Sequence, residues 1–211
     1  MLHTPITGGR GTDHPIRVEV VDTPGRSLAR RTRSSRLRIG PAPGSVPVMV
    51  TWNEFADAAP RIAAVFRRRH AATGNLCLLA TIRSDGYPRI SPIEPRILGG
   101  ELLLVGRPAT TKVRDLGRDP RFCLHTATVD PQVGDGDAKL WGKVRNLRDP
   151  DLHQRFAADL FEETGMDLRG QAFDPFYAAD LTGASTVAIE DGQLAITIWR
   201  PGAEERVVRK T

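Results

Sequence analysis

The segment from Arg89 to Arg121 contains the residues best suited to bind an anion. A predicted strand ends near Gly106, then Thr110 and Thr111 follow a proline, and Lys112 begins a short predicted helix. Free backbone N–H groups at a helix start, two hydroxyl groups and an ammonium group would together hold a phosphate. The alternative is that the threonines only cap the helix and the lysine is solvated. Local chemistry alone slightly favours this second interpretation.

Other catalytic motifs are not recognisable in the sequence. No serine stands in a nucleophile-elbow context, and no glycine-rich loop resembles a nucleotide-binding loop. No pair of histidines has metal-ligand spacing, so we expect no metal site. Two cysteines lie in apolar stretches, which is typical of buried thiols in a reducing compartment. These scattered residues are His3, His14, His70, His125, His153, Cys77 and Cys123.

The net charge of +5 comes from one end of the chain of 211 residues. Residues 1–48 hold eight arginines and three acidic residues, whereas the rest holds 22 basic and 22 acidic residues. We therefore expect no nucleic-acid partner for the body of the protein. No apolar run is long enough to cross a bilayer or to form a signal core, so we expect a cytoplasmic protein without a membrane partner.

Residues 1–48 are predicted to be a disordered basic extension, or a product of a start codon placed too far upstream, with Met49 as the true start. An alternative function would make this extension an arm that binds anionic partners. The folded domain is expected over residues 49–211. It begins with a capping box from Thr51 to Glu54 and an amphipathic helix to about His70 that Pro60 kinks or restarts.

The rest of the pattern predicts strands with two further helices. Asp-Gly and Gly-Gly pairs between the strands supply the positive φ angles of tight hairpins. Leu102–Val105 is apolar on both faces, so both faces of the sheet must be covered. An antiparallel β-barrel with peripheral helices meets this requirement. The predicted strands are 76–82, 87–97, 101–106, 121–129, 139–147, 185–190 and 194–200, and the helices are 108–117 and 149–164.

The segment 89–121 resembles the flavin-binding core of the pyridoxamine 5′-phosphate oxidase family. In that family a basic strand leads through a hairpin to a Ser/Thr-Arg/Thr-Lys element and then to a helix that ends in Asn/Asp-Pro-Arg. Here Thr110-Thr111-Lys112 and Asp119-Pro120-Arg121 match these motifs. The resemblance implies a six- or seven-stranded split β-barrel, mainly β with peripheral helices. It places cofactor contacts at Arg89, Ile90, Ser91, Pro92, Ile93, Glu94, Val105, Gly106, Thr110, Thr111, Lys112, Trp141 and Gly142.

This resemblance also implies an oxidoreductase that is a homodimer, with FMN or the deazaflavin coenzyme F-420 at the dimer interface and a small organic substrate. The cofactor would carry the hydride, so no catalytic side chain is identified. The oxidases have a lysine in place of Glu94 and an arginine in place of Thr111. The resemblance therefore does not imply that this chain binds a substrate phosphate in the way the oxidases do. The alternative function is a non-catalytic protein that binds a flavin or haem for storage or sensing.

Overall fold

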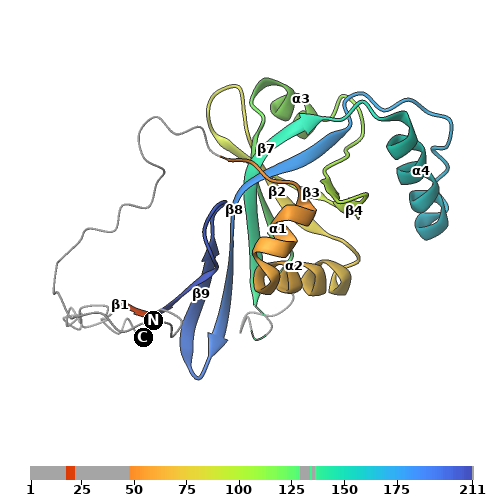
Figure 1. Cartoon of the computed structure of the whole chain (residues 1–211). Coiled ribbons are helices and arrows are strands. Elements are labelled where there is room, and N and C mark those ends of the chain that lie inside the picture. The colour runs from red at the N-terminus through yellow and green to blue at the C-terminus, as the bar shows by residue number, and fades with distance from the viewer. Residues whose placement is uncertain (1–17, 22–47, 129–133, 135, 211) are drawn as a thin grey trace, which may run out of the picture.

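The computed structural model describes residues 18–21, 48–128, 134 and 136–210. In this part of the chain ten strands form one antiparallel sheet, with four helices around it (Figure 1). The predicted antiparallel, mainly β fold with peripheral helices is confirmed. The helices are α1 (Trp52–Ala58), α2 (Pro60–Ala72), α3 (Thr111–Arg118) and α4 (Pro150–Thr164). The strands are β1 (Val18–Val21), β2 (Cys77–Ile82), β3 (Pro88–Ile93), β4 (Arg96–Leu98), β5 (Glu101–Leu103), β6 (Arg121–Thr126), β7 (Asp137–Asn146), β8 (Tyr177–Glu190), β9 (Gln193–Trp199) and β10 (Arg206–Lys210).

Strands β2 to β8 close into a ring. β3, β2, β6, β7 and β8 are hydrogen-bonded neighbours in that order, and β8 also pairs with β5, which pairs with β4. The chain joins β3 to β4 through only Glu94 and Pro95. The ring therefore has seven strands, or six if β3 and β4 are counted as halves of one bent strand. This is the predicted split barrel.

The long strand β8 connects this barrel to a smaller sheet. Of its 14 residues, the segment from Tyr177 to Val187 pairs with β7 along the barrel, and the segment from Ala184 to Glu190 pairs with β9. Strands β10 and β1 follow β9, so the sheet extends well beyond the barrel (Figure 1). One strand thus belongs to both parts of the fold.

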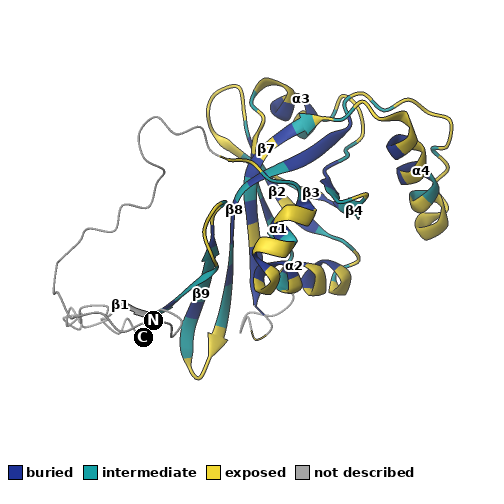
Figure 2. Ribbon diagram, in the orientation of Figure 1, coloured by how far each residue is buried: buried dark blue, intermediate teal, exposed yellow. Residues whose placement is uncertain are grey.

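Helices α1 and α2 close the barrel and complete its main core. Thr51 and Glu54 form the predicted capping box of α1, and Pro60 begins α2 as a new helix. Trp52 and Phe66 are fully buried and pack with the inward side chains of the strands. The buried residues concentrate on the barrel strands, whereas the outer faces of the helices are exposed (Figure 2). This core fixes the positions of the strands that carry the site.

Helix α4 forms a second, smaller core on the outside of the barrel. Asp149 caps its first turn and Gly165 ends it in the left-handed region at φ 73°, as the Asp-Pro and Gly signals predict. Its buried side chains Leu152 and Phe156 pack on the start of β8. No helix in the described ranges is long and apolar enough to span a membrane.

Several strands differ from the predictions. The strand predicted over 87–97 is interrupted after Ile93, because Pro95 has no N–H group for a ladder bond. β8 begins at Tyr177 and not at residue 185, and β10 was not predicted. Within the predicted disordered extension, residues 18–21 form β1, which pairs with β10. Residues 1–17 and 22–47 lie outside the described residues, so that prediction is untested there.

Candidate functional site

The first turn of α3 lies against the end of β3 and the segment that follows β5. The Lys112 ammonium donates a hydrogen bond to the carbonyl oxygen of Pro92 at 2.5 Å. A Cβ atom on Gly106 would lie 3.0 Å from a methyl carbon of Val113 and 3.5 Å from Cε of Lys112. The half-buried Val105 precedes this glycine. The structure therefore brings together the residues predicted on three separate segments, and Gly106 allows the close contact.

The backbone N–H groups at the start of α3 have no partner in the described part of the chain. The hydroxyl of Thr110 donates to the carbonyl oxygen of Arg107 at 3.0 Å and does not cap the helix. Thr111 is exposed, and its hydroxyl makes no hydrogen bond to the described residues. The N–H groups of 111–113 therefore point out of an uncapped helix end. The interpretation in which the threonines merely cap α3 is not what the structure shows.

The other three helices differ from α3 in this respect. Thr51 accepts from the first turn of α1, and Asp149 accepts from two N–H groups of α4. At the start of α2, the carboxylate of Glu205 accepts from two N–H groups at 3.3 and 2.9 Å. Helix ends normally obtain such acceptors. The uncapped end of α3, with a lysine in its first turn, is consequently suited to an acceptor from outside the chain, such as a phosphate.

A buried carboxylate, Asp115, fixes α3 on the sheet. It accepts hydrogen bonds from Thr81 of β2 at 3.0 Å, from Arg89 of β3 at 2.6 Å and from Arg118 at 3.2 Å. Burial alone would raise the pKa of Asp115, but these three donors outweigh it and lower the pKa. Sequence reasoning missed this residue, because nothing distinguishes an aspartate in a short polar helix from a solvated one.

The residues predicted on the strand 89–94 divide between the two faces of β3. Arg89 and Ser91 are half-buried and Ile93 is buried, whereas the side chains between them are exposed. Arg89 is engaged by Asp115, so its first role here is structural. Glu94 follows the strand and is exposed. The outward-facing positions of β3 are Ile90, which is 70% exposed, and Pro92.

The predicted contacts on β7 lie three strands away from β3 along the sheet order. The half-buried Trp141 has the guanidinium of Arg200 over its ring at 4.6 Å. A Cβ atom on Gly142 would lie 1.9 Å from the carbonyl oxygen of Asp180, at the β-bulge between β7 and β8. The need for glycine at this position is therefore explained by contact with β8. A contact of Gly142 with a cofactor stays a prediction.

One row of residues crosses the outer face of the sheet between these two regions. By strand register, Ile90 faces Ala80, Ala80 faces Cys123, Cys123 faces Trp141 and Trp141 faces Gly183. The row from β3 to β7 spans three strand spacings, or about 14–15 Å. The residues of the row are uncharged, the Arg200 guanidinium lies over its β7 end at Trp141, and the adjacent Leu78 is 40% exposed. A flat apolar group could lie along this surface.

Other groups in the described part of the chain do not form a catalytic cluster. No group of three or more potential metal ligands is found there. Burial, with a smaller effect from Glu94, raises the pKa of the Cys77 thiol to about 12, which leaves it protonated. Arg96 is paired with Glu163 of α4. The arrangement is suited to an anion next to an apolar surface, and these described residues offer no acid–base pair.

Comparison with protein families agrees with this geometry. The sequence profile described as pyridoxamine 5′-phosphate oxidase matches residues 67–189, which include β2 to β7, α3, α4 and most of β8. The chain belongs to this family. A search of curated proteins finds no match.

Several solved structures have a fold similar to that of this chain. PhzG from Burkholderia lata 383, in complex with tetrahydrophenazine-1-carboxylic acid, is 14% identical with a TM-score of 0.52, covering 78% of this chain and 98% of PhzG. A haem-binding protein from Mycobacterium smegmatis is 23% identical with a TM-score of 0.48, covering 64% of this chain. The match spans 57% of the length of that haem-binding protein. A pyridoxamine 5′-phosphate oxidase-related, FMN-binding protein from Nostoc punctiforme PCC 73102 is 13% identical with a TM-score of 0.49. The match covers 71% of this chain and 94% of the Nostoc protein. At these identities the likeness concerns the fold alone.

Proposed function

We propose that this member of the pyridoxamine 5′-phosphate oxidase family is an oxidoreductase that uses FMN or the deazaflavin coenzyme F-420. The observation that carries the proposal is the start of α3, where uncapped N–H groups meet the ammonium of Lys112. A phosphate monoester or diester satisfies both features, because it supplies several anionic acceptor oxygens. Both cofactors contain such a phosphate. Membership of the family supports the choice of a flavin-type group.

The residues of this chain would bind and orient the cofactor. Lys112 keeps two N–H bonds for the phosphate when one is used by Pro92, and the Thr111 hydroxyl is free to add another. Asp115 holds the helix in place, so the donors do not have to reorganise on binding. The row from Ile90 to Trp141 offers an apolar surface for the ring. When bound, the cofactor supplies hydride transfer to or from a small organic substrate.

The outer face of the sheet also supports the proposed homodimer. Ile90, Leu78 and Tyr87 are 70%, 40% and 69% exposed on neighbouring parts of β2, β3 and their hairpin. Exposed apolar surface of this kind commonly marks an interface. A second copy of the chain would cover it and exclude water from a ring lying along the row. We assign this role to the domain predicted over residues 49–211.

The binding test compares Lys112→Ala with Lys210→Ala, which removes an exposed lysine on β10. Loss of one charge-assisted bond of about 1.5–3 kcal/mol should weaken FMN binding by about 10- to 100-fold. Titration of FMN fluorescence measures the dissociation constant of each full-length variant. Lys112→Arg should restore part of the affinity, because it returns a cation. Equal affinity of wild type and Lys112→Ala would refute the phosphate site.

The absorption spectrum of the purified protein separates the alternatives. A flavin spectrum that bleaches with a reductant and recovers with an electron acceptor supports the enzyme. A colourless protein that binds F-420 more tightly than FMN assigns the deazaflavin. A Soret band with no flavin affinity would instead support the haem-storage or sensor alternative and refute the oxidoreductase.

A further inference from the structure

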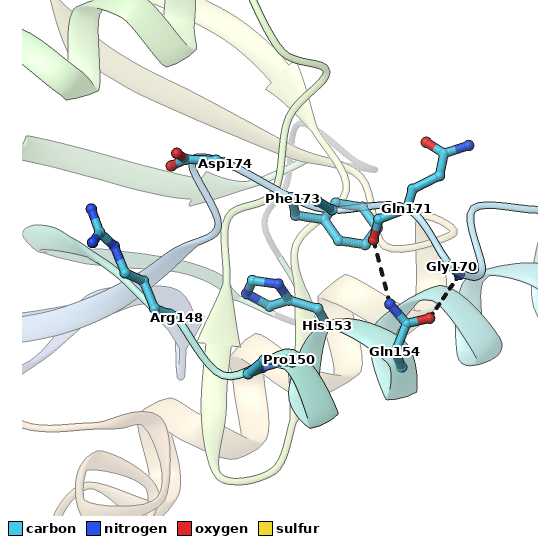
Figure 3. A pocket seen from close by; sticks show the side chains of 9 residues that line it. Arg148, Pro150, His153, Gln154, Gly170, Gln171, Phe173 and Asp174 are labelled. Carbon is cyan, nitrogen blue, oxygen red and sulfur yellow. Dashed lines mark hydrogen bonds between the residues drawn. The ribbon is translucent and has the colours of Figure 1, made fainter.

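A cavity of about 510 Å³ lies on the outside of the barrel, between the first turns of α4 and the loop that leads into β8 (Figure 3). Its walls come from Arg148 between β7 and α4, from His153 and Gln154 of α4, and from the loop residues Phe173 and Asp174. None of these residues is among the predicted cofactor contacts. The volume is within the range of small-molecule sites, about 300–1,000 Å³.

Side-chain hydrogen bonds tie the loop wall of this cavity to α4. The Gln154 side chain accepts from the N–H of Gly170 at 2.8 Å and donates to the carbonyl oxygen of Gln171 at 3.4 Å (Figure 3). At the other end of the loop, Asn146 donates to the carboxylate of Asp174 at 3.1 Å. The same amide accepts from the N–H of Phe176 at 2.8 Å. The cavity is therefore formed before any ligand enters, which lowers the entropy cost of binding.

Two rings form one wall. His153 is only 9% exposed, and its Nε2 lies 3.0 Å from the carbonyl oxygen of Leu147. A carbonyl only accepts, so Nε2 donates, and in the neutral ring Nδ1 is an acceptor. The imidazole packs edge-on to Phe173, with ring centroids 5.7 Å apart, and its centroid is 4.2 Å from that of Phe176. This wall is suited to a flat, apolar body.

Two oppositely charged side chains, Arg148 and Asp174, also line the cavity. In Figure 3 they lie to the left of the rings of His153 and Phe173. Both side chains are exposed, and within the described ranges neither has an ion-pair partner. A cation alone would leave Arg148 unpaired, and an anion alone would leave Asp174 unpaired. A ligand with both charges satisfies both side chains.

We propose that this cavity binds a small aromatic amino-carboxylate, such as an aromatic α-amino acid. Its carboxylate pairs with Arg148, its ammonium pairs with Asp174, and its ring packs against Phe173 and His153. The guanidinium fork matches a carboxylate, and the carboxylate of Asp174 already has a fixed position. The site is separate from the cofactor residues, so it does not depend on the proposed redox function.

Isothermal titration calorimetry of the full chain with L-tryptophan and L-phenylalanine tests the proposal. We expect saturable one-to-one binding, and at least about tenfold weaker binding of 3-phenylpropionate and of phenethylamine, each of which lacks one charge. Arg148→Gln and Asp174→Asn should each weaken tryptophan binding by about the same factor. Arg155→Gln, at an exposed position of α4 outside the cavity, should leave it unchanged.

The comparison of ligands on the wild-type protein keeps the proposal testable if a variant fails to fold. Absence of saturable binding of either amino acid would overturn the proposal. The same holds if a one-charge analogue binds as tightly as tryptophan, or if folded Arg148→Gln binds as tightly as wild type. Loss of FMN binding in Lys112→Ala without loss of tryptophan binding would show that the two sites are independent.

Discussion

Replacement of Asp115 by asparagine tests the idea that a buried carboxylate holds α3 in place. The substitution keeps the size of the side chain and removes its charge. In one orientation the amide oxygen still accepts from Thr81 and Arg89, and the NH₂ faces the donor Arg118. In the other orientation the NH₂ faces the donors Thr81 and Arg89. We therefore expect Asp115→Asn to destabilise the protein and to weaken FMN binding through displacement of the first turn of α3.

The size of the effect depends on how far water can replace the lost bonds. The carboxylate is 6% exposed, whereas the side chains of Arg89 and Arg118 are 31% and 42% exposed. Loss of a fully buried partner costs about 3–5 kcal/mol, and partial solvation of both arginines reduces this to about 2 kcal/mol. For a domain of this size that corresponds to a fall in Tm of about 4–8 °C.

Urea denaturation of wild type and Asp115→Asn, at pH 7 and at pH values below 3.8, measures the contribution and its pH dependence. The pKa of Asp115 is lowered from 3.8 in the folded state. Its stabilising effect is therefore complete above 3.8, the value for the unfolded chain, and is lost as the pH falls through the lower folded value. The difference between the two proteins should shrink in acid.

The control is Asp159→Asn, which changes an exposed carboxylate of α4 and should leave the free energy of unfolding unchanged at both pH values. The reasoning is refuted if Asp115→Asn is as stable as wild type at pH 7, or if its deficit stays constant in acid. Either result would mean that the carboxylate is not held as an anion by its three donors.

Three further changes test other parts of the structure. Gly142→Ala should prevent folding or lower Tm by more than about 8 °C, because its Cβ would lie 1.9 Å from the Asp180 carbonyl oxygen, whereas Gly134→Ala, with open space around it, should fold normally on a thermal melt. The Cys77 thiol, with a pKa of about 12, should resist iodoacetamide at pH 8 in the native protein and react only after unfolding, as followed by mass spectrometry. Ile90→Glu should give monomers in analytical ultracentrifugation if a second copy covers this face, and a persistent dimer would exclude that interface.

The sequence predicts those parts of the fold that depend on local chemistry. The capping box at Thr51, the new helix at Pro60 and the end of α4 at Gly165 each follow from a residue that satisfies or frees a backbone group. The hairpins at Asp-Gly and Gly-Gly pairs follow for the same reason. These signals act within a few residues, so one sequence is enough to detect them.

The missed strands depend on partners far along the chain. The first half of β8 contains Ala178, Ala179 and Gly183, which are weak strand formers, and it is a strand because β7 and β5 pair with it. β10 is short and charged and is defined by its pairing with β9. Local patterns carry no information on such pairing.

The candidate site was predictable where the family motif and helix chemistry agree. Lys112 and Gly106 were expected to meet at the start of a short helix, and they do. Asp115 was missed because its burial follows from the docking of α3 on β2 and β3. Gly142 was predicted as a cofactor contact, but the need for glycine there comes from the bulge between β7 and β8, which no local sequence pattern indicates.

Because β8 belongs both to the barrel and to the smaller sheet that it forms with β9, β10 and β1, the two parts are mechanically connected. A force applied to β9 or β10 acts directly on the ladder between β8 and β7, which holds the barrel together. The amide protons at the two ends of β8 should therefore exchange with solvent by local fraying of each end. Those in the middle of β8 should exchange more slowly, because they exchange only when the entire sheet opens. A molecule that bound to β9 or β10 would consequently act on the hydrogen bonds between β8 and β7 and so on the barrel.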